Sequence, residues 1–163
     1  MVLARSVAKS DADRKLFDNI EKYDCHVISV ANIVGEEGPT FSYSIGLTTT
    51  LNAPELLIVG LGSKLAHTMI NGYRDDIKNG REFIPGAFYS GFLDGFDVLL
   101  IEANESARKD FAIWADWYHE RMHFPLYQCI WPTTSGVWPW QTNADADFKS
   151  TQPILGDIPK SLK

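Results

Sequence analysis

Short apolar runs separated by tight turns constrain the fold of this chain more than any other feature of its sequence. Asn-Ala-Pro at residues 52–54 and Asp-Gly at residues 94–95 follow strand-length apolar runs, and residues 35–39 predict a further turn. Because so few residues connect these runs, neighbouring strands are expected to pair antiparallel. The predicted helices come singly between groups of strands, which favours an α+β fold over a regularly alternating α/β fold.

The expected order of elements follows from hydrophobic periodicity and capping residues. Apolar positions at helical spacing predict three helices, and alternating or continuous apolar runs predict about six strands. The helices are expected at residues 10–23, 63–79 and 106–123. The strands are expected at residues 25–31, 41–48, 55–61, 87–93, 96–103 and 126–131. We expect a mainly antiparallel sheet, curled into a partial barrel, with the three helices packed on it.

Length and charge exclude several classes of protein. The 163 residues predict a single domain, with a core at about residues 10–148 and a mobile tail at residues 149–163. The net charge of −6 argues against general nucleic-acid binding and against anionic membrane surfaces. No apolar run approaches the roughly 20 residues that span a bilayer, and residues 1–15 lack the apolar core of a signal peptide.

The two cysteines indicate the cellular compartment. Cys25 and Cys129 lie far apart in the sequence, each inside an apolar strand-like run, which is typical of buried free thiols in a reducing cytoplasm. A single disulfide between them is the alternative. Cys25 and His26 are neighbours on a predicted strand, so their side chains face opposite ways and form no catalytic dyad. His67 is expected as a partly exposed helix residue, with an acid or base role as its alternative.

Aromatic residues concentrate in the C-terminal third. All five tryptophans lie between residues 111 and 148. Trp131, Trp138 and Trp140 flank prolines, and such rigid amphipathic rings either line the mouth of a pocket or close one end of the core. Trp138 and Trp140 are equally candidates for anchors of a protein partner.

Two polar residues stand inside apolar strands. Glu55 begins an otherwise apolar run, and Gln128 lies within the run at residues 126–131. A carboxylate or an amide in such a position needs hydrogen bonds, which come either from the backbone or from a ligand. The sequence leaves both interpretations open.

Residues 119–123 match the zinc-protease pattern His-Glu-x-x-His. Two histidines four apart on a helix project together, and the glutamate between them activates a metal-bound water. The helical wheel, however, places His119 and His123 on the solvent side of the predicted helix. Its buried side is expected to hold Ala107, Phe111, Trp114, Tyr118 and Met122. We therefore expect no metal site, and keep zinc hydrolysis through His119, Glu120 and His123 as the alternative.

The placement of cations limits the chemistry of a ligand. No lysine or arginine occurs at residues 23–63 or 122–148, so a site built there favours a neutral, aromatic or cationic ligand. A phosphorylated ligand would need a cation from outside these segments. The candidates are Lys64, Arg74, Arg81 and Arg121.

Several short motifs carry a family resemblance. They are Tyr43-Ser44-Ile45-Gly46-Leu47, Pro54-Glu55-Leu56, Gly60-Leu61, and Gln128-Cys129-Ile130-Trp131-Pro132 with Gly136 and Pro139-Trp140. In combination they resemble the bacterial domain of unknown function 4262 family, from about residue 26 to residue 148. The chain departs from that pattern at Cys25, Ser44 and Thr133. The resemblance implies a bacterial single-domain protein without an assigned reaction, and the family pattern lacks the paired histidines.

The sequence thus predicts a site where residues 41–47, 54–55 and 128–140 converge. We expect a pocket for a small organic or aromatic ligand, lined by Tyr43, Ser44, Glu55, Gln128, Trp131, Trp138 and Trp140. The alternative is a protein-interaction module, such as an accessory or neutralising protein of a bacterial gene cluster. The sequence does not fix a cofactor, a reaction or the oligomeric state, and it leaves a homodimer open.

Overall fold

A six-stranded sheet with helices against both faces forms the centre of the computed structural model, which describes residues 8–31 and 38–163. The turn expected at residues 35–39 lies mostly outside the described residues. The strand order is β1-β2-β3-β6-β5-β4. The strands are β1 (His26–Val30), β2 (Phe41–Ile45), β3 (Glu55–Val59), β4 (Ala87–Leu93), β5 (Phe96–Glu102) and β6 (Leu126–Ile130).

The pairing of the strands confirms the α+β class and a mostly antiparallel sheet. All neighbouring pairs are antiparallel except β3 and β6, which run parallel. The sheet is open, with β1 and β4 at its two edges, so the expected partial barrel does not close. The parallel pair arises because the long segment from β3 to β6 crosses over through a helix and a hairpin.

Six α-helices occur in the described residues, where the sequence predicted three. They are α1 (Asp11–Tyr23), α2 (Leu47–Leu51), α3 (Ser63–Lys78), α4 (Glu105–Asp110), α5 (Ile113–Tyr118) and α6 (Ala146–Thr151). The first two predicted helices are confirmed as α1 and α3. In α1 the Ser10 hydroxyl accepts a hydrogen bond from the backbone N–H of Asp13, which is the expected N-cap.

The third predicted helix is wrong as a single element. It is divided into α4 and α5, because Ala112 leaves the helical region with φ −83° and ψ 50°. The break changes the angular phase of every later residue, so the helical wheel fails beyond it. Tyr118 is buried as expected, whereas Trp114 and Met122 are 46% and 53% exposed.

The strand expected to reach residue 48 ends at Ile45. Gly46 has a φ of +108°, and a Cβ atom at this position would lie 2.9 Å from Cγ1 of Ile20. Glycine alone combines this left-handed backbone with the close approach of α1. The chain therefore turns at Gly46 into α2, where the hydroxyl of Thr50 donates to the Gly46 carbonyl at 2.9 Å.

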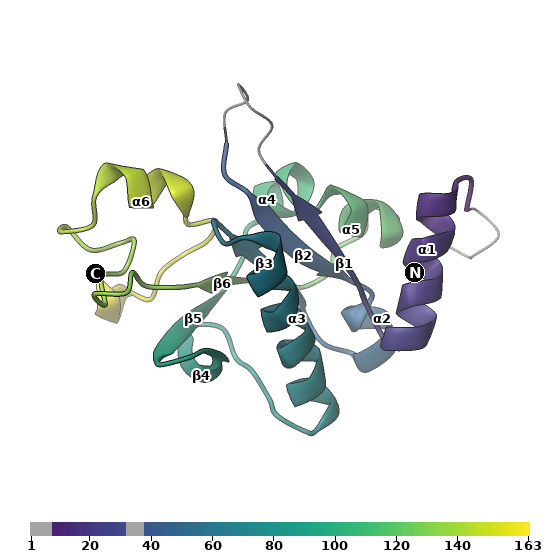
Figure 1. Ribbon diagram of the computed structural model, residues 1–163, viewed down its shortest axis with the longest axis horizontal. Helices are drawn as coiled ribbons and strands as arrows, with labels where there is room; N and C mark the ends of the chain where they lie inside the picture. Colours follow the sequence, from purple (N-terminus) through teal and green to yellow (C-terminus); the bar gives the residue numbers. More distant parts are fainter. Residues whose placement is uncertain (1–7, 32–37) are drawn as a thin grey trace.

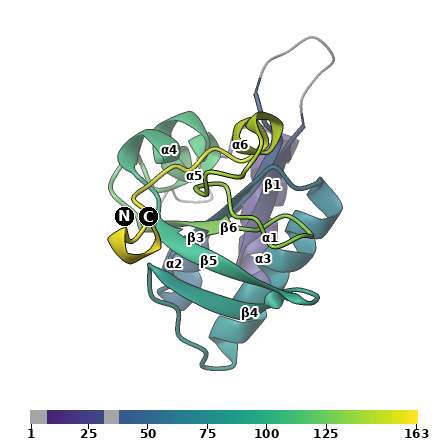
Figure 2. The ribbon, with the colours of Figure 1, turned by 90° about the vertical axis from the view of Figure 1, so that its left-hand side faces the viewer.

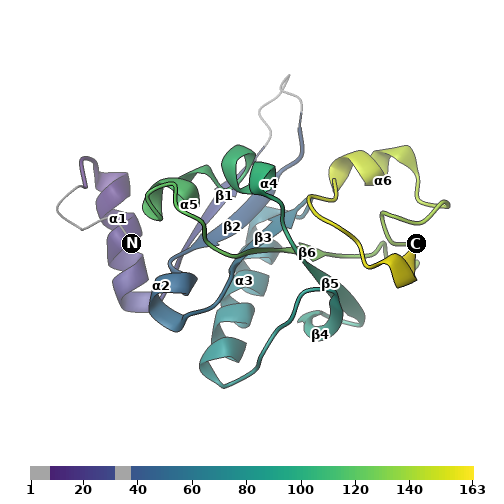
Figure 3. The same cartoon turned by 180° about the vertical axis from the view of Figure 1, so that it is seen from behind.

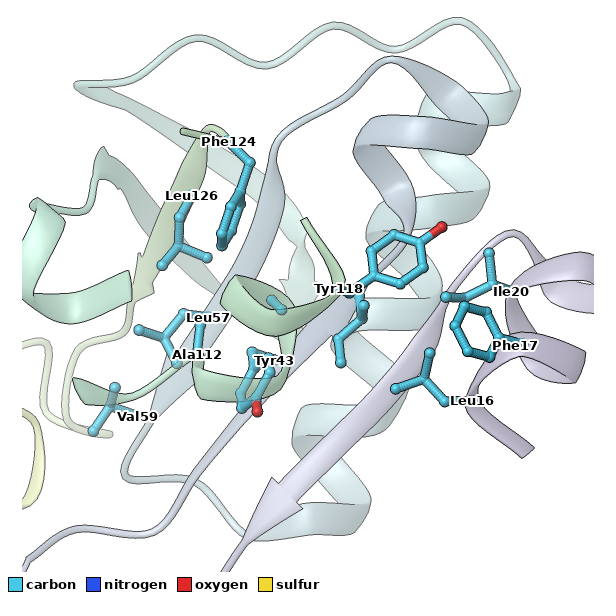
Figure 4. Close-up of a cluster of buried hydrophobic side chains, with 12 residues drawn as sticks. Leu16, Phe17, Ile20, Tyr43, Leu57, Val59, Ala112, Tyr118, Phe124 and Leu126 are labelled. Atoms are coloured by element: carbon cyan, nitrogen blue, oxygen red, sulfur yellow. The ribbon is translucent and has the colours of Figure 1, made fainter. Parts of the chain in front are cut away.

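The two faces of the sheet carry separate cores. Figure 1 shows α3 against one face, and Figure 3 shows α4 and α5 against the other. Figure 4 shows how the second core gathers side chains from α1, α5 and the strands. It includes Leu16, Phe17, Ile20, Tyr43, Leu57, Val59, Tyr118, Phe124 and Leu126. The α3 core includes Leu56, Ile58, Met69, Ile70, Tyr73, Leu100 and Cys129.

The last residues of the chain pack on the sheet, although the sequence predicted a mobile tail at residues 149–163. Gln152 and Ile158 are buried, and Gly156 forms a β-bridge with Ala103. The backbone N–H of Asn104 donates to the carbonyl of Leu155 at 2.7 Å. Figure 2 looks onto this end of the molecule, where α6 and the C-terminus lie.

Two further expectations concern the cysteines and the membrane. Cys25 and Cys129 are both buried free thiols, as predicted. None of the helices in residues 8–31 and 38–163 has the length and apolar character needed to cross a membrane.

Candidate functional site

Glu55 is the centre of a closed polar cluster at the start of β3. Its Oε1 atom accepts hydrogen bonds from the Ser44 hydroxyl at 2.9 Å and from the Leu47 N–H at 3.0 Å. Its Oε2 atom lies 2.9 Å from both the Gly46 nitrogen and Nε2 of His119. The side chain is fully buried, and four donors occupy its carboxylate. Glu55 therefore holds the turn at Gly46 in place, which is the backbone-binding role that the sequence left open.

His119 lies inside this cluster rather than on the solvent side, so its predicted exposure is wrong. Only 5% of the residue is exposed. Its ring stacks on Phe124 with centroids 4.4 Å apart, and its Nε2 atom is bonded to Glu55. The division of the predicted helix explains the error, because α5 ends at Tyr118 and turns His119 inward.

The His-Glu-x-x-His segment does not form a zinc-protease helix. Glu120 and Arg121 have φ values of 56° and 58°, which lie in the left-handed region. His123 is exposed, and its Nδ1 atom lies 3.0 Å from Nη1 of Arg108. The zinc-protease pattern requires both histidines to point at one metal position. Here the two histidines face different partners instead. Among the described residues, no cluster of three or more metal-ligating side chains is arranged to hold an ion.

Gln128 binds residues 152–160, which we call the C-terminal segment, to the sheet. Its amide nitrogen donates to the Pro153 carbonyl at 2.8 Å, and its amide oxygen accepts from the Leu155 N–H at 2.8 Å. The side chain is fully buried. Like Glu55, it serves backbone groups, and both ends of its amide are occupied.

Tyr43 and Trp131, the expected pocket walls, are held by hydrogen bonds within the protein. The Tyr43 hydroxyl accepts from the backbone N–H of Trp114 at 3.1 Å, and burial raises the pKa of Tyr43 to about 12. The indole nitrogen of Trp131 donates to the Val59 carbonyl at 2.9 Å, and the edge of its ring meets Phe148. These contacts position both rings in the packing between elements.

Trp138 and Trp140 stack on each other over a third, smaller cluster of buried residues, beside the two cores described above. Their ring centroids are 5.0 Å apart and their planes meet at 18°. Both pack against the cluster of Leu99, Ile101, Ile130 and Ile158. This arrangement closes one end of the core, which is one of the two interpretations that the sequence allowed.

A large cavity lies elsewhere, at the end of the molecule that holds the C-terminal segment. This cavity, the C-terminal groove, has a volume of about 1060 Å³. Its apolar surface comes from β5, the start of β6 and the C-terminal segment, namely Ile101, Phe124, Leu126, Ile154, Ile158 and Pro159. Among the described residues that line it, none is one of the seven predicted ligand-binding residues.

Charged side chains of both signs line the C-terminal groove. The basic ones are Arg108, Arg121 and Lys160, and the acidic ones are Glu102, Glu105 and Asp157. Arg108 is buried, and its guanidinium contacts His123, Glu105 and, at 3.8 Å, Asp116. Because arginine only donates, Nδ1 of His123 must accept, and the ring carries its proton on Nε2.

A comparison with known protein families identifies the family of this chain. Residues 19–145 match the domain of unknown function (DUF4262) family. The chain belongs to the DUF4262 family. This match confirms the predicted resemblance and covers most of the 163 residues. Neither the curated proteins nor the solved structures contain a significant match.

In this DUF4262 protein the motifs that carry the resemblance lie in three adjacent strands and the loops beside them. β2, β3 and β6 are neighbours in the sheet. Glu55 and Gln128 bind separate sets of protein groups, Trp138 and Trp140 pack in another part of the core, and the C-terminal groove uses other residues. From the sequence, Arg121 was expected only as a cation for a phosphorylated ligand. Arg108 and Lys160 gave no signal, because no local pattern shows that residues 101–108, 121–126 and 154–160 line one cavity.

Proposed function

We propose that this protein binds a small organic ligand of balanced charge in the C-terminal groove. The observation that carries the proposal is a cavity of about 1060 Å³ that brings charges of both signs together beside a smaller apolar surface. Ligand sites in proteins commonly measure about 300–1,000 Å³, and the polar groups in them orient the ligand.

The charges at the groove favour a dipolar ligand. Arg121 and Lys160 are exposed cations that suit a carboxylate, and Glu102 and Asp157 are exposed acids that suit an ammonium group. Three basic and three acidic side chains offset one another, so a strongly charged ligand gains little net attraction. An amino-acid-like molecule with an apolar side chain meets these requirements.

His123 adds one titratable group to the groove. Its Nδ1 atom is occupied by Arg108, which fixes the orientation of the ring and the position of its proton. A neutral imidazole held in this way donates a hydrogen bond from Nε2. We assign it a role in orienting the ligand, and we assign no reaction to it.

Native mass spectrometry of protein purified from its host tests the proposal. We expect a retained small molecule, lost in Arg121→Met and Glu102→Gln but kept in Lys64→Met, which removes an exposed cation outside the groove. A nuclear magnetic resonance titration with zwitterionic amino acids provides the second measurement. Absence of a retained molecule, together with no shift of groove signals in the titration, would refute the proposal.

A protein-interaction module remains the second candidate, and it rests on a different tryptophan from those expected. Trp114 and Ile113 on α5 are 46% and 56% exposed, and Trp114 meets the edge of Trp117. Aromatic residues on an exposed apolar face are typical anchors of protein interfaces. A co-purifying protein that is lost in Trp114→Ser, with the groove variants unaffected, would favour this function over ligand binding.

A further inference from the structure

A second cavity lies on the other side of the molecule, between α1, the edge strand β1 and α3. We name it the α1–α3 cavity, and its volume is about 400 Å³. α1 contributes Lys15, Asn19 and Tyr23, and α3 contributes His67, Asn71 and Arg74. Cys25, His26 and Val27, at the start of β1, complete the lining.

The charge of this lining is of one sign. Lys15 and Arg74 are cations, and His26 and His67 are basic groups, whereas none of the described residues that line the cavity is acidic. The whole chain carries a net charge of −6, so this concentration of basic side chains runs against its overall charge. The C-terminal groove, in contrast, pairs its cations with acids. A water-filled concave surface with one sign of charge attracts counter-ions.

Arg74 and His26 are held in place by neighbouring groups, and Nη1 of Arg74 also lies 3.4 Å from the Tyr23 carbonyl oxygen. Nη1 of Arg74 donates to Oδ1 of Asn71 at 3.2 Å, while Nε of the same guanidinium pairs with Asp75 at 3.0 Å. Nδ2 of Asn19 lies 2.9 Å from Nδ1 of His26. Since the amide nitrogen donates, the neutral His26 ring carries its proton on Nε2. Among the described groups, the donors left for an incoming anion include Nη2 of Arg74, Nε2 of His26 and the ammonium group of Lys15.

The basic neighbours of His26 also act on its ring. Burial lowers the pKa of His26, and the nearby charges of Lys15 and His67 lower it further. An anion bound beside these groups would oppose the effect of both charges. The cavity therefore favours an anion for the same electrostatic reason that it disfavours a second proton on His26.

We propose that the α1–α3 cavity binds the anionic group of a small molecule, a phosphate or a carboxylate, through Arg74, Lys15 and the two histidines. Guanidinium groups bind both anions with paired, charge-assisted hydrogen bonds. The ring of Tyr23 and the side chain of Val27 provide apolar contacts for the rest of the molecule. This site is separate from the C-terminal groove and does not depend on the function proposed for it.

The cavity is a binding site and not the site of a cysteine nucleophile. Cys25 is 4% exposed, and burial raises its pKa to about 11, so the thiol stays protonated near neutral pH. Nucleophilic cysteines need the thiolate. His26 follows Cys25 on the strand and is bonded to Asn19, which agrees with the absence of a dyad expected from the sequence.

Titrations of the full chain with inorganic phosphate and, separately, with acetate and citrate test the proposal. Ionic strength is held constant with chloride, and the backbone amide shifts of residues 15–27 and 67–74 are followed by nuclear magnetic resonance. We expect saturable shifts there, and the stronger of the phosphate and carboxylate arms identifies the preferred anion. Equal, non-saturating shifts over the whole surface would show screening by salt and overturn the proposal.

Two variants and one control separate a built site from general attraction. Arg74→Gln is expected to weaken anion binding about tenfold or more, which is the usual effect of losing a charge-assisted hydrogen bond. Lys15→Glu alters an exposed residue, so it tests the same site even where Arg74→Gln lowers stability. Lys64→Met, on the exposed start of α3, should leave the affinity unchanged. Equal affinities of wild type and Lys15→Glu would refute the assignment.

Binding in the C-terminal groove serves as an independent readout for the same variants. Lys15→Glu should retain any groove ligand detected by native mass spectrometry, because its side chain belongs to the other cavity. Loss of anion binding with retention of the groove ligand supports both proposals. Anion binding without a groove ligand supports the α1–α3 cavity alone.

Discussion

The polar residues of the family motifs and the exposed cations of the two cavities differ in burial and in hydrogen bonding. Glu55 and Gln128 are fully buried, and protein donors or acceptors occupy their polar atoms. Arg121, Lys160 and Lys15 are exposed and line open volumes. The motifs that identify this family therefore mark its architecture. The residues suited to ligand binding lie mainly outside them.

The largest effect on stability is expected from Glu55→Ala. The substitution leaves the N–H groups of Gly46 and Leu47, the Ser44 hydroxyl and the His119 ring without their buried acceptor. We expect a loss of at least about 3 kcal/mol in the free energy of unfolding, measured by urea denaturation. Glu82→Ala, an exposed glutamate, is the matched control. A loss similar to that of the control would contradict the structural role that we assign to Glu55.

A smaller loss, about 2 kcal/mol, is expected from Gln128→Leu. The leucine fills much of the space but leaves the Pro153 carbonyl and the Leu155 N–H unpaired. Amide hydrogen exchange should become faster at residues 153–158 and stay slow in α3. Uniform exchange rates across the chain, or protection unchanged at these residues, would argue that Gln128 does not hold the C-terminal segment.

A still smaller change in the free energy of unfolding is expected when the pH is lowered. The pKa of His26 is lowered, mainly by burial, so the unfolded chain binds a proton more readily than the native chain. The stability that His26 contributes is therefore present above its usual pKa of 6.5 and decreases as the pH falls below that value. His26→Gln should flatten this part of the pH dependence between about pH 7 and pH 5. Identical curves for wild type and variant would contradict the prediction.

The smallest change in stability is expected at the groove. Arg121→Met alters an exposed residue with a left-handed backbone, and we expect the free energy of unfolding to stay within about 0.5 kcal/mol of wild type. Thermal and urea unfolding measure this directly. A large loss in the free energy of unfolding would show that Arg121, like Glu55, is needed for the stability of the fold.

Local signals in the sequence predicted the elements that depend on near neighbours. The hairpin of β4 and β5 follows from the Asp-Gly turn at residues 94–95, and α1 begins at Ser10 because its hydroxyl caps the helix. The need of Glu55 and Gln128 for hydrogen bonds was also evident, since a polar group in an apolar strand must be satisfied.

Features that depend on distant residues could not be predicted in the same way. His119 is buried because its partner, Glu55, lies 64 positions earlier in the sequence, and a helical wheel contains no such information. The helix break at Ala112 was likewise not predictable, because no proline or glycine lies next to it in the sequence. The parallel pairing of β3 and β6 depends on the whole crossover between them, and the wall that residues 154–160 add to the groove depends on Gln128.

The C-terminal segment separates the proposed ligand site from the part of the chain that identifies the family. Ile154, Ile158 and Lys160 line the groove, yet they lie beyond residues 19–145, the part that matches the family. A chain trimmed to the matched residues would keep every family motif and lose one side of the groove. None of the hydrogen bonds of Glu55 involves residues of this terminal stretch. The proposed ligand site can therefore change in sequence while the Glu55 cluster stays the same.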